Sequence, residues 1–147
     1  VPIDETDLSL EVMMTNTSVC VMHEEHPLAA LKSISPSDIG DAPLILLGAG
    51  RRWRSQVDQV FADHRLRPVV SIETHTHGSA CALAAKGIGM AILNERLAQP
   101  YLHGQLVARP FQPEIIHQYA FATTRLSPPS RLTIAFRNVA AEYFRLA

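Results

Sequence analysis

The sequence alternates short apolar runs of strand length with segments whose apolar residues recur at helical spacing. The clearest example lies near the centre, where the apolar run Leu44–Leu47 ends at Gly48-Ala49-Gly50 and a helical stripe begins at Trp53. A strand without polar interruptions is typical of a sheet that is covered on both faces. Strands that alternate with helices in this way predict an α/β fold with a largely parallel sheet.

The same patterns assign elements to the rest of the chain. Strands are expected over residues 8–12, 17–22, 44–47, 69–74, 90–93, 105–107 and 115–124. Helices are expected over residues 35–39, 53–64, 78–86, 95–99 and 131–144. Asn94 and Ser130 are suited to cap the last two helices, because their side chains accept hydrogen bonds from free N–H groups. Gly87 is suited to end the helix before it in the left-handed conformation.

Composition narrows the class of protein. The chain has 147 residues, of which 47% are hydrophobic and 18% charged, and its formal net charge is −1. High apolar content with almost no net charge excludes intrinsic disorder. Domains that bind nucleic acid usually carry a basic excess, which this chain lacks. No uncharged run approaches the roughly 20 residues that cross a bilayer, so no membrane-spanning helix is expected.

Two cysteines and the first residues bear on cellular context. Cys20 and Cys81 lie in apolar runs without metal or redox spacing, so we expect buried, reduced thiols and a reducing compartment. The start, Val1-Pro2, is neither an initiator methionine nor a signal segment, so we expect further sequence to precede it.

Four phrases in sequence order resemble the effector-binding domain of LysR-type transcriptional regulators. The phrases are VCVMHEEHPLA from Val19, the turn, proline and strand of residues 35–47, FADHRLRPVVSIE from Phe61, and ALAAKGIGMAILN from Ala82. The resemblance implies an α/β, periplasmic-binding-protein-like (type 2) effector domain, in which two subdomains enclose a ligand cleft. It also implies a cytoplasmic regulator that assembles as a dimer or tetramer and is not an enzyme.

The resemblance further implies that only part of the effector domain is present. Residues 1–16 would be the outgoing edge of subdomain I, residues 17–117 all of subdomain II, and residues 118–147 the returning strand and C-terminal helix of subdomain I. The helix-turn-helix that reads DNA would precede Val1, so this chain alone would bind no DNA. The apolar faces of residues 8–12 and 132–144 would then pack on the remainder of subdomain I.

Two loops are candidates for binding the effector. In open α/β sheets, ligands bind beyond the carboxyl ends of strands, where helix N-termini present free N–H groups. Gly48-Ala49-Gly50-Arg51 and His75-Thr76-His77-Gly78-Ser79 are both strand-to-helix loops. The resemblance places His23, His75 and the Ala49–Gly50 loop beside the effector. The predicted effector-binding residues are His23, Ala49, Gly50, Arg51, His75, Thr76, His77 and Ser79. Their N–H and hydroxyl groups suit a small carboxylate, such as an organic acid or an amino-acid-like molecule.

Two alternatives remain open at this point. The first is the solute-binding protein of a transporter, which shares the fold. The second is a metal-dependent enzyme that uses the histidine pairs His23/His26 and His75/His77. H-E-E-H lacks the H-E-x-x-H spacing of a helical metal site, and Pro27 disfavours a helix there. We therefore predict no metal site, no cofactor and no catalytic residue.

Overall fold

A computed structural model describes residues 7–50 and 52–146. The chain divides into two compact units. The larger unit is Asn16–Ile116, and the smaller unit combines the residues before Asn16 with those after Ile116. Strand β1 (Leu8–His23) belongs to both units, because it begins in the smaller one and ends in the larger one.

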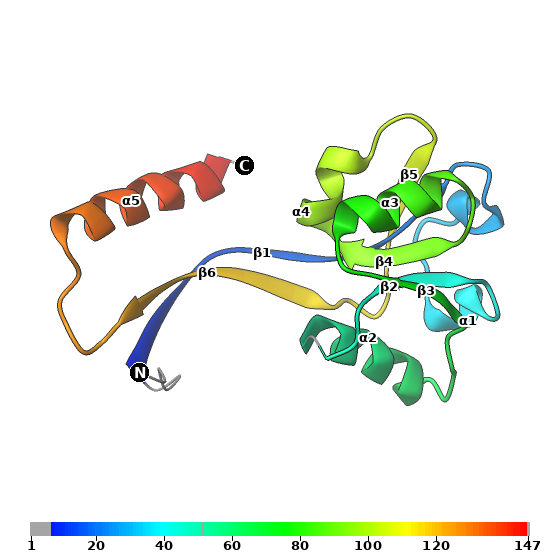
Figure 1. Ribbon diagram of the computed structural model, residues 1–147, viewed down its shortest axis with the longest axis horizontal. Coiled ribbons are helices and arrows are strands. Elements are labelled where there is room, and N and C mark those ends of the chain that lie inside the picture. Colours follow the sequence, from blue (N-terminus) through cyan, green and yellow to red (C-terminus); the bar gives the residue numbers. More distant parts are fainter. Residues whose placement is uncertain (1–6, 51, 147) are drawn as a thin grey trace. The chain divides into compact units, whose positions relative to one another are not determined.

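The larger unit contains most of the helices and strands (Figure 1). After β1 come the 3-10 turn η2 (Pro27–Ala30), α1 (Pro36–Ile39), β2 (Leu44–Leu47), α2 (Arg52–Asp63), β3 (Val70–Thr74), α3 (His77–Ala85), β4 (Met90–Asn94), α4 (Glu95–Ala98), the 3-10 turn η3 (Gln99–Tyr101) and β5 (Leu106–Pro110). The predicted α/β alternation is therefore confirmed.

The sheet of the larger unit is mixed, with strand order β3-β2-β4-β1-β5. Strand β2 is parallel to β3 and to β4, as expected for strands joined through crossover helices. Strand β1 is antiparallel to both β4 and β5. The predicted largely parallel sheet is thus correct only for β2, β3 and β4, because β1 precedes the crossover units and runs in the opposite direction.

Strand β1 also differs from prediction in length. The sequence predicted separate strands over residues 8–12 and 17–22, whereas the structure has one strand of 16 residues. The intervening stretch from Met13 to Asn16 breaks the regular alternation of apolar and polar residues, yet its backbone stays extended. The burial of β1 increases within the larger unit, where the five residues Ser18–Met22 are all buried.

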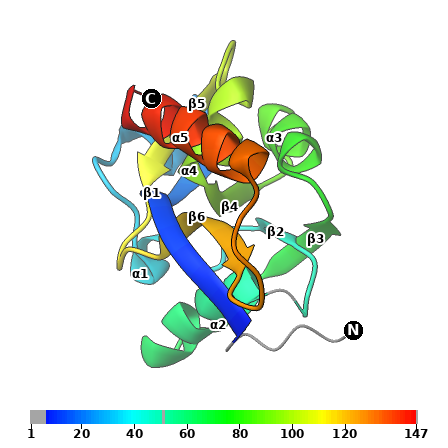
Figure 2. The ribbon, with the colours of Figure 1, turned by 90° about the vertical axis from the view of Figure 1, so that its left-hand side faces the viewer.

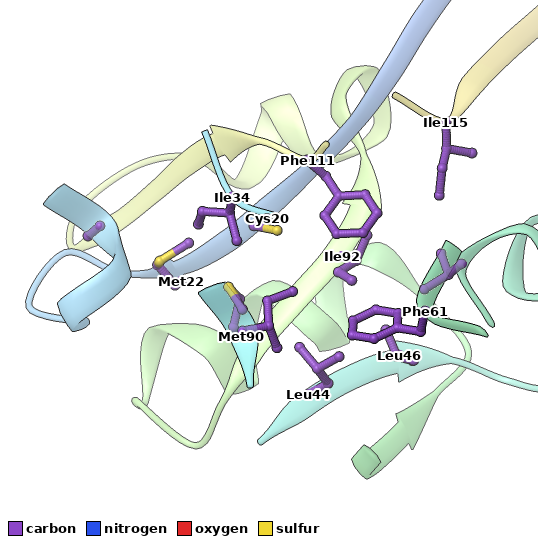
Figure 3. Packing of buried hydrophobic residues seen from close by; sticks show 13 residues of the cluster. Cys20, Met22, Ile34, Leu44, Leu46, Phe61, Met90, Ile92, Phe111 and Ile115 are labelled. Carbon is purple, nitrogen blue, oxygen red and sulfur yellow. The ribbon is translucent and has the colours of Figure 1, made fainter. Parts of the chain in front are cut away.

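Helices cover both faces of the larger unit's sheet, with α2 on one side and α3 on the other (Figure 1). The α2 side holds the larger core cluster, in which Phe61 from α2 and Phe111 stack with ring centroids 6.3 Å apart (Figure 3). The α3 side is lined by small residues, among them Ala80, Cys81 and Ala84. Burial on both faces explains why β2 is apolar at every position.

A buried glycine brings β2 and β4 together at their starts. Met90 donates a backbone hydrogen bond of 3.0 Å to the carbonyl oxygen of Pro43. A Cβ atom on Gly89 would lie 2.6 Å from that same oxygen, which is closer than real side chains approach. Only glycine therefore allows this close passage of the two chain segments.

The smaller unit consists of the first half of β1, strand β6 (Ile116–Thr124) and helix α5 (Arg131–Leu146). Strand β6 pairs with β1, and α5 lies beside this pair in both views (Figures 1 and 2). Phe121 contacts Phe136, with ring centroids 5.9 Å apart, and Tyr119 contacts Phe144. Ser130 caps α5 as predicted, accepting a hydrogen bond of 3.1 Å from the backbone N–H of Thr133.

The apolar stripe of α5 is only partly covered within the described part of the chain. Leu132 is 79% exposed, Val139 67% and Tyr143 62%. On the strand side of the same unit, Leu10 is 65% exposed. So many exposed apolar residues on one small unit indicate a surface that is suited to pack against further protein.

Candidate functional site

The carboxyl ends of the three parallel strands meet at one edge of the larger unit's sheet. Leu47 at the end of β2 is the register partner of Thr74 at the end of β3. Gly48, the next residue, donates a backbone hydrogen bond of 2.9 Å to the carbonyl oxygen of Thr74. Helices α2 and α3 both begin just beyond these strand ends, so their N-termini lie at this edge, which we call the carboxyl edge.

His75 lies against Gly48 at the carboxyl edge. A Cβ atom on Gly48 would be 3.5 Å from Nδ1 of His75, which places the imidazole directly beside the bare backbone of the glycine. Gly50 has a φ of +84°, a conformation that side chains disfavour. Ala49, Gly50 and His75 are all exposed. The two predicted loops are therefore neighbours, with accessible backbone on one and an accessible imidazole on the other.

The hydroxyl groups of the second loop fix the start of α3. Thr76 is the N-cap, and its Oγ1 accepts a hydrogen bond of 3.0 Å from the backbone N–H of Ser79. The same hydroxyl donates to Oγ of Ser79 at 2.8 Å. His77 is the first residue of the helix and is half-buried. These hydroxyls therefore order the helix N-terminus through the capping interaction.

The two remaining predicted residues are Arg51 and His23. Arg51 lies outside the described residues. His23 lies at the opposite edge of the sheet, where it is the register partner of Leu106 at the start of β5. The expectation that His23 adjoins the other site residues is wrong, because β1 runs antiparallel to β4 and so presents Ser18, not His23, beside Asn94.

Buried polar residues to which the sequence reasoning gave no role at the site support the carboxyl edge from within the sheet. Ser18 is fully buried, and Asn94 is nearly so. The indole Nε1 of Trp53 donates to Oγ of Ser18 at 3.4 Å. The amide Nδ2 of Asn16 donates to Oδ1 of Asn94 at 2.8 Å. The sequence did carry a signal for these residues. In both β1 and β4, every second residue changes from apolar to polar toward the carboxyl edge. The residues are Met22, Cys20, Ser18 and Asn16 in β1, and Met90, Ile92 and Asn94 in β4.

A buried arginine also stabilises this edge. Arg54 in α2 donates through Nη1 to the carbonyl oxygen of Leu47 at 3.0 Å and to Oε1 of Glu73 at 2.8 Å. Its Nε donates to Oδ1 of Asp58 at 3.0 Å. Burial lowers the pKa of Arg54, but the hydrogen bonds and charges of Glu73 and Asp58 outweigh it and raise the pKa overall. The guanidinium is therefore fixed in its charged form by these carboxylates.

The histidine pairs show no metal-binding geometry. Among the described residues, no three His, Cys, Asp or Glu side chains are grouped so that they could hold a metal ion. In the first pair, Nδ1 of His23 accepts a hydrogen bond from the backbone N–H of Glu25, and Nδ1 of His26 accepts one from the backbone N–H of Leu28.

Within the described residues 7–50 and 52–146, no helix is long and apolar enough to span a bilayer.

Comparison with known proteins decides the family. Residues 1–145 match the family model described as the LysR substrate binding domain. This chain belongs to that family. The resemblance found in the sequence is therefore confirmed, and so is the periplasmic-binding-protein-like α/β fold that it implied.

Individual relatives of this LysR substrate-binding domain agree. The transcriptional activator protein LysR of Escherichia coli (strain K12) is 30% identical over 124 residues, which is 84% of this chain and 40% of that protein. The effector-binding domain of QuiR matches with a TM-score of 0.80 and 21% identity over 97% of this chain and 68% of that one. The regulatory domain of CcmR from Synechocystis PCC6803 matches with a TM-score of 0.82 and 21% identity, over 98% and 70%. The chain thus spans less than half of its curated relative.

Proposed function

We propose that this chain is part of the effector-sensing domain of a LysR-type transcriptional regulator and binds a small carboxylate at the carboxyl edge. The relatives support the regulatory role, since the curated proteins that match are named as transcriptional regulators and activators. They do not favour a transporter's solute-binding protein or a metalloenzyme. The structural relatives support the ligand class, because the QuiR domain was solved with shikimate, a carboxylate, and the CcmR domain with 2-PG.

The juxtaposition of Gly48 and His75 is the observation that carries the proposed site. The imidazole Nδ1 lies 3.5 Å from the Cβ position of Gly48, on the edge where α2 and α3 begin. N–H groups at helix N-termini favour an anion, and a hydrogen bond to a carboxylate is stronger than one between neutral groups. We assign the carboxylate to the space bounded by His75, the Ala49–Gly50 backbone and the N-terminus of α3 that Thr76 and Ser79 order.

Regulation would follow from a shift between two states of the effector domain. A ligand changes the populations only if it binds the two states with different affinity. As in other LysR-type regulators, we assign DNA binding to a helix-turn-helix and assembly to a dimer or tetramer. Such a protein acts on DNA in the cytoplasm and catalyses no reaction, so binding rather than turnover is the property to measure.

A thermal-shift screen tests the proposed function. Shikimate, benzoate and a set of amino acids serve as carboxylate probes, and a ligand at 100 times its Kd is expected to stabilise the protein by about 2.7 kcal/mol. Gly48→Val fills the space beside His75, and His75→Ala removes the imidazole, so both are expected to weaken binding at least tenfold. His23→Ala is the matched control, because His23 lies at the opposite edge of the sheet.

Two results would contradict the proposal. One is that none of the carboxylates shifts the melting temperature of the wild-type protein. The other is that a carboxylate does bind, but Gly48→Val and His75→Ala bind it as tightly as His23→Ala does. The second result would leave a carboxylate-binding protein whose site lies elsewhere.

A further inference from the structure

Trp53 follows the Gly48–Gly50 loop in the chain and packs against the core. It lies in the first turn of α2, three residues after Gly50, and is the sole tryptophan of the chain. Its half-buried side chain packs against both core clusters, the one on the α2 face and the one on the α3 face of the sheet. If the loop is displaced and moves the start of α2, the Trp53 side chain, which contacts the core on both faces of the sheet, would therefore move as well.

The residue that Trp53 contacts on β1 connects several chain segments. The indole Nε1 donates to Oγ of Ser18, which is fully buried. The backbone N–H of Ser18 donates to the carbonyl oxygen of Ile115 at 3.2 Å, and the carbonyl oxygen of Ser18 accepts from the N–H of Phe111 at 3.1 Å. Ser18 lies two residues beyond the point where β1 enters the larger unit, and Ile115 lies just before β6 leaves it.

We propose that Trp53 is a positioning residue that transmits the state of the Gly48–Gly50 loop, through Ser18, to the two segments by which the chain enters and leaves the larger unit. The inference rests on the proposed function for the part that concerns the effector. Coupling between distant segments can be carried by packed side chains and hydrogen bonds. Here the Gly48–Gly50 loop leads along the chain into the first turn of α2, Trp53 donates to Ser18, and Ser18 donates to Ile115. Because Ser18 is fully buried, any effect it has on the effector must pass through other residues.

Hydrogen–deuterium exchange without any ligand tests the relay first. Trp53→Phe keeps an aromatic ring but removes the indole N–H, and Ser18→Ala removes the hydroxyl that accepts it. Both variants are expected to speed exchange at least threefold in residues 16–20 and 115–118. Ser71→Ala is the matched control, since it removes a hydroxyl hydrogen bond to the carbonyl oxygen of Leu44 at the start of β2. Unchanged exchange in both segments for both variants would overturn the inference.

A second arm uses a carboxylate that has passed the thermal-shift screen. In the wild-type protein it is expected to change the fluorescence of Trp53 and to slow exchange in residues 16–20. In Ser18→Ala the ligand is expected to change the fluorescence still, while the slowing of exchange is lost. Equal slowing in wild type and Ser18→Ala would overturn the relay. If no carboxylate binds, the proposed function fails, and the ligand-free exchange still decides the inference.

Discussion

Nη1 of Arg54 lies 3.0 Å from the carbonyl oxygen of Leu47 and donates a hydrogen bond to it. The same nitrogen bonds Glu73, so a single side chain from α2 connects the end of β2 with β3. Leu47 is followed directly by Gly48, the first residue of the proposed effector-binding loop. The position of that loop therefore depends on a charge that is buried in the larger unit.

Replacing Arg54 is expected to destabilise the protein. Arg54→Met leaves the carbonyl of Leu47 without this donor and Glu73 and Asp58 without their cation. Removing one partner of a fully buried pair costs about 3–5 kcal/mol. Here the carboxylates are 47% and 50% exposed, so solvent screening reduces the expected cost to about 1–2 kcal/mol. Urea denaturation measures the loss, with Arg52→Met on the exposed face of α2 as control. Equal stability of the two variants would contradict the assigned role.

The capping box of α1 predicts a pH dependence. Asp38 accepts hydrogen bonds from the side chain and the backbone of Ser35, and both lower the pKa of its carboxyl. A group whose pKa falls on folding stabilises the folded state above its unfolded pKa, which for Asp is about 3.9. This stabilisation is lost as the pH falls through the lower folded value.

The measurement compares wild type with Asp38→Asn by urea denaturation from pH 7 down to pH 2. The wild-type protein is expected to be more stable at neutral pH, with the difference shrinking as the carboxyl is protonated in acid. Asp41→Asn serves as a control, because Asp41 is a nearby exposed aspartate. A stability difference that stays constant down to the lowest pH would show that the charge of Asp38 contributes nothing.

The two thiols are expected to be unreactive in the folded protein. Burial raises the pKa of Cys81 to about 11. The pKa of Cys20 is raised as well, first by burial and then by the negative charge of Asp38. Because the thiolate is the nucleophile, iodoacetamide at pH 8 should modify both residues far more slowly in the folded protein than in urea. Mass spectrometry of the modified peptides checks this, and equal rates in the two conditions would refute it.

The exposed apolar stripe of α5 is expected to make the 147-residue chain self-associate. Leu132 and Val139 are 79% and 67% exposed on one small unit, and contiguous apolar surface favours association. Sedimentation velocity over a concentration series should show association of the wild-type chain. The double variant Leu132→Glu, Val139→Glu should sediment as a monomer, whereas Asn138→Glu, a change at an exposed polar position, should not alter the result. A wild-type chain that stays monomeric at every concentration would disprove the expectation.

The sequence predicted what depends on local pattern. The β2-loop-α2 unit could be recognised because an uninterrupted apolar run, glycines and a helical stripe follow one another within 20 residues of Leu44. Asn94 was correctly expected to cap a helix, since its side chain accepts from the N–H of Leu97. These features require no knowledge of which segments meet in space.

Features that depend on strand direction or on distant partners could not be predicted in this way. His23 ends a strand just as Thr74 does, and only the antiparallel register of β1 places it at the other edge. From the sequence alone, Arg54 is expected to be an exposed helix residue. Only the structure shows that Leu47 and Glu73 accept its hydrogen bonds. In the sequence, Ser18 is only a polar residue within a strand. The structure shows that its hydroxyl oxygen accepts a hydrogen bond from Trp53.

Gly89 sets a limit on how this sequence can diverge. A single added carbon would strike the carbonyl oxygen of Pro43, so neither a smaller neighbour nor a different rotamer can make room for it. The obstacle is backbone, which gives way less easily than the far end of a side chain. The QuiR domain shares only 21% sequence identity with this chain. Even among relatives this distant, we expect position 89 to be glycine. The apolar residues around it can be exchanged for others of similar volume.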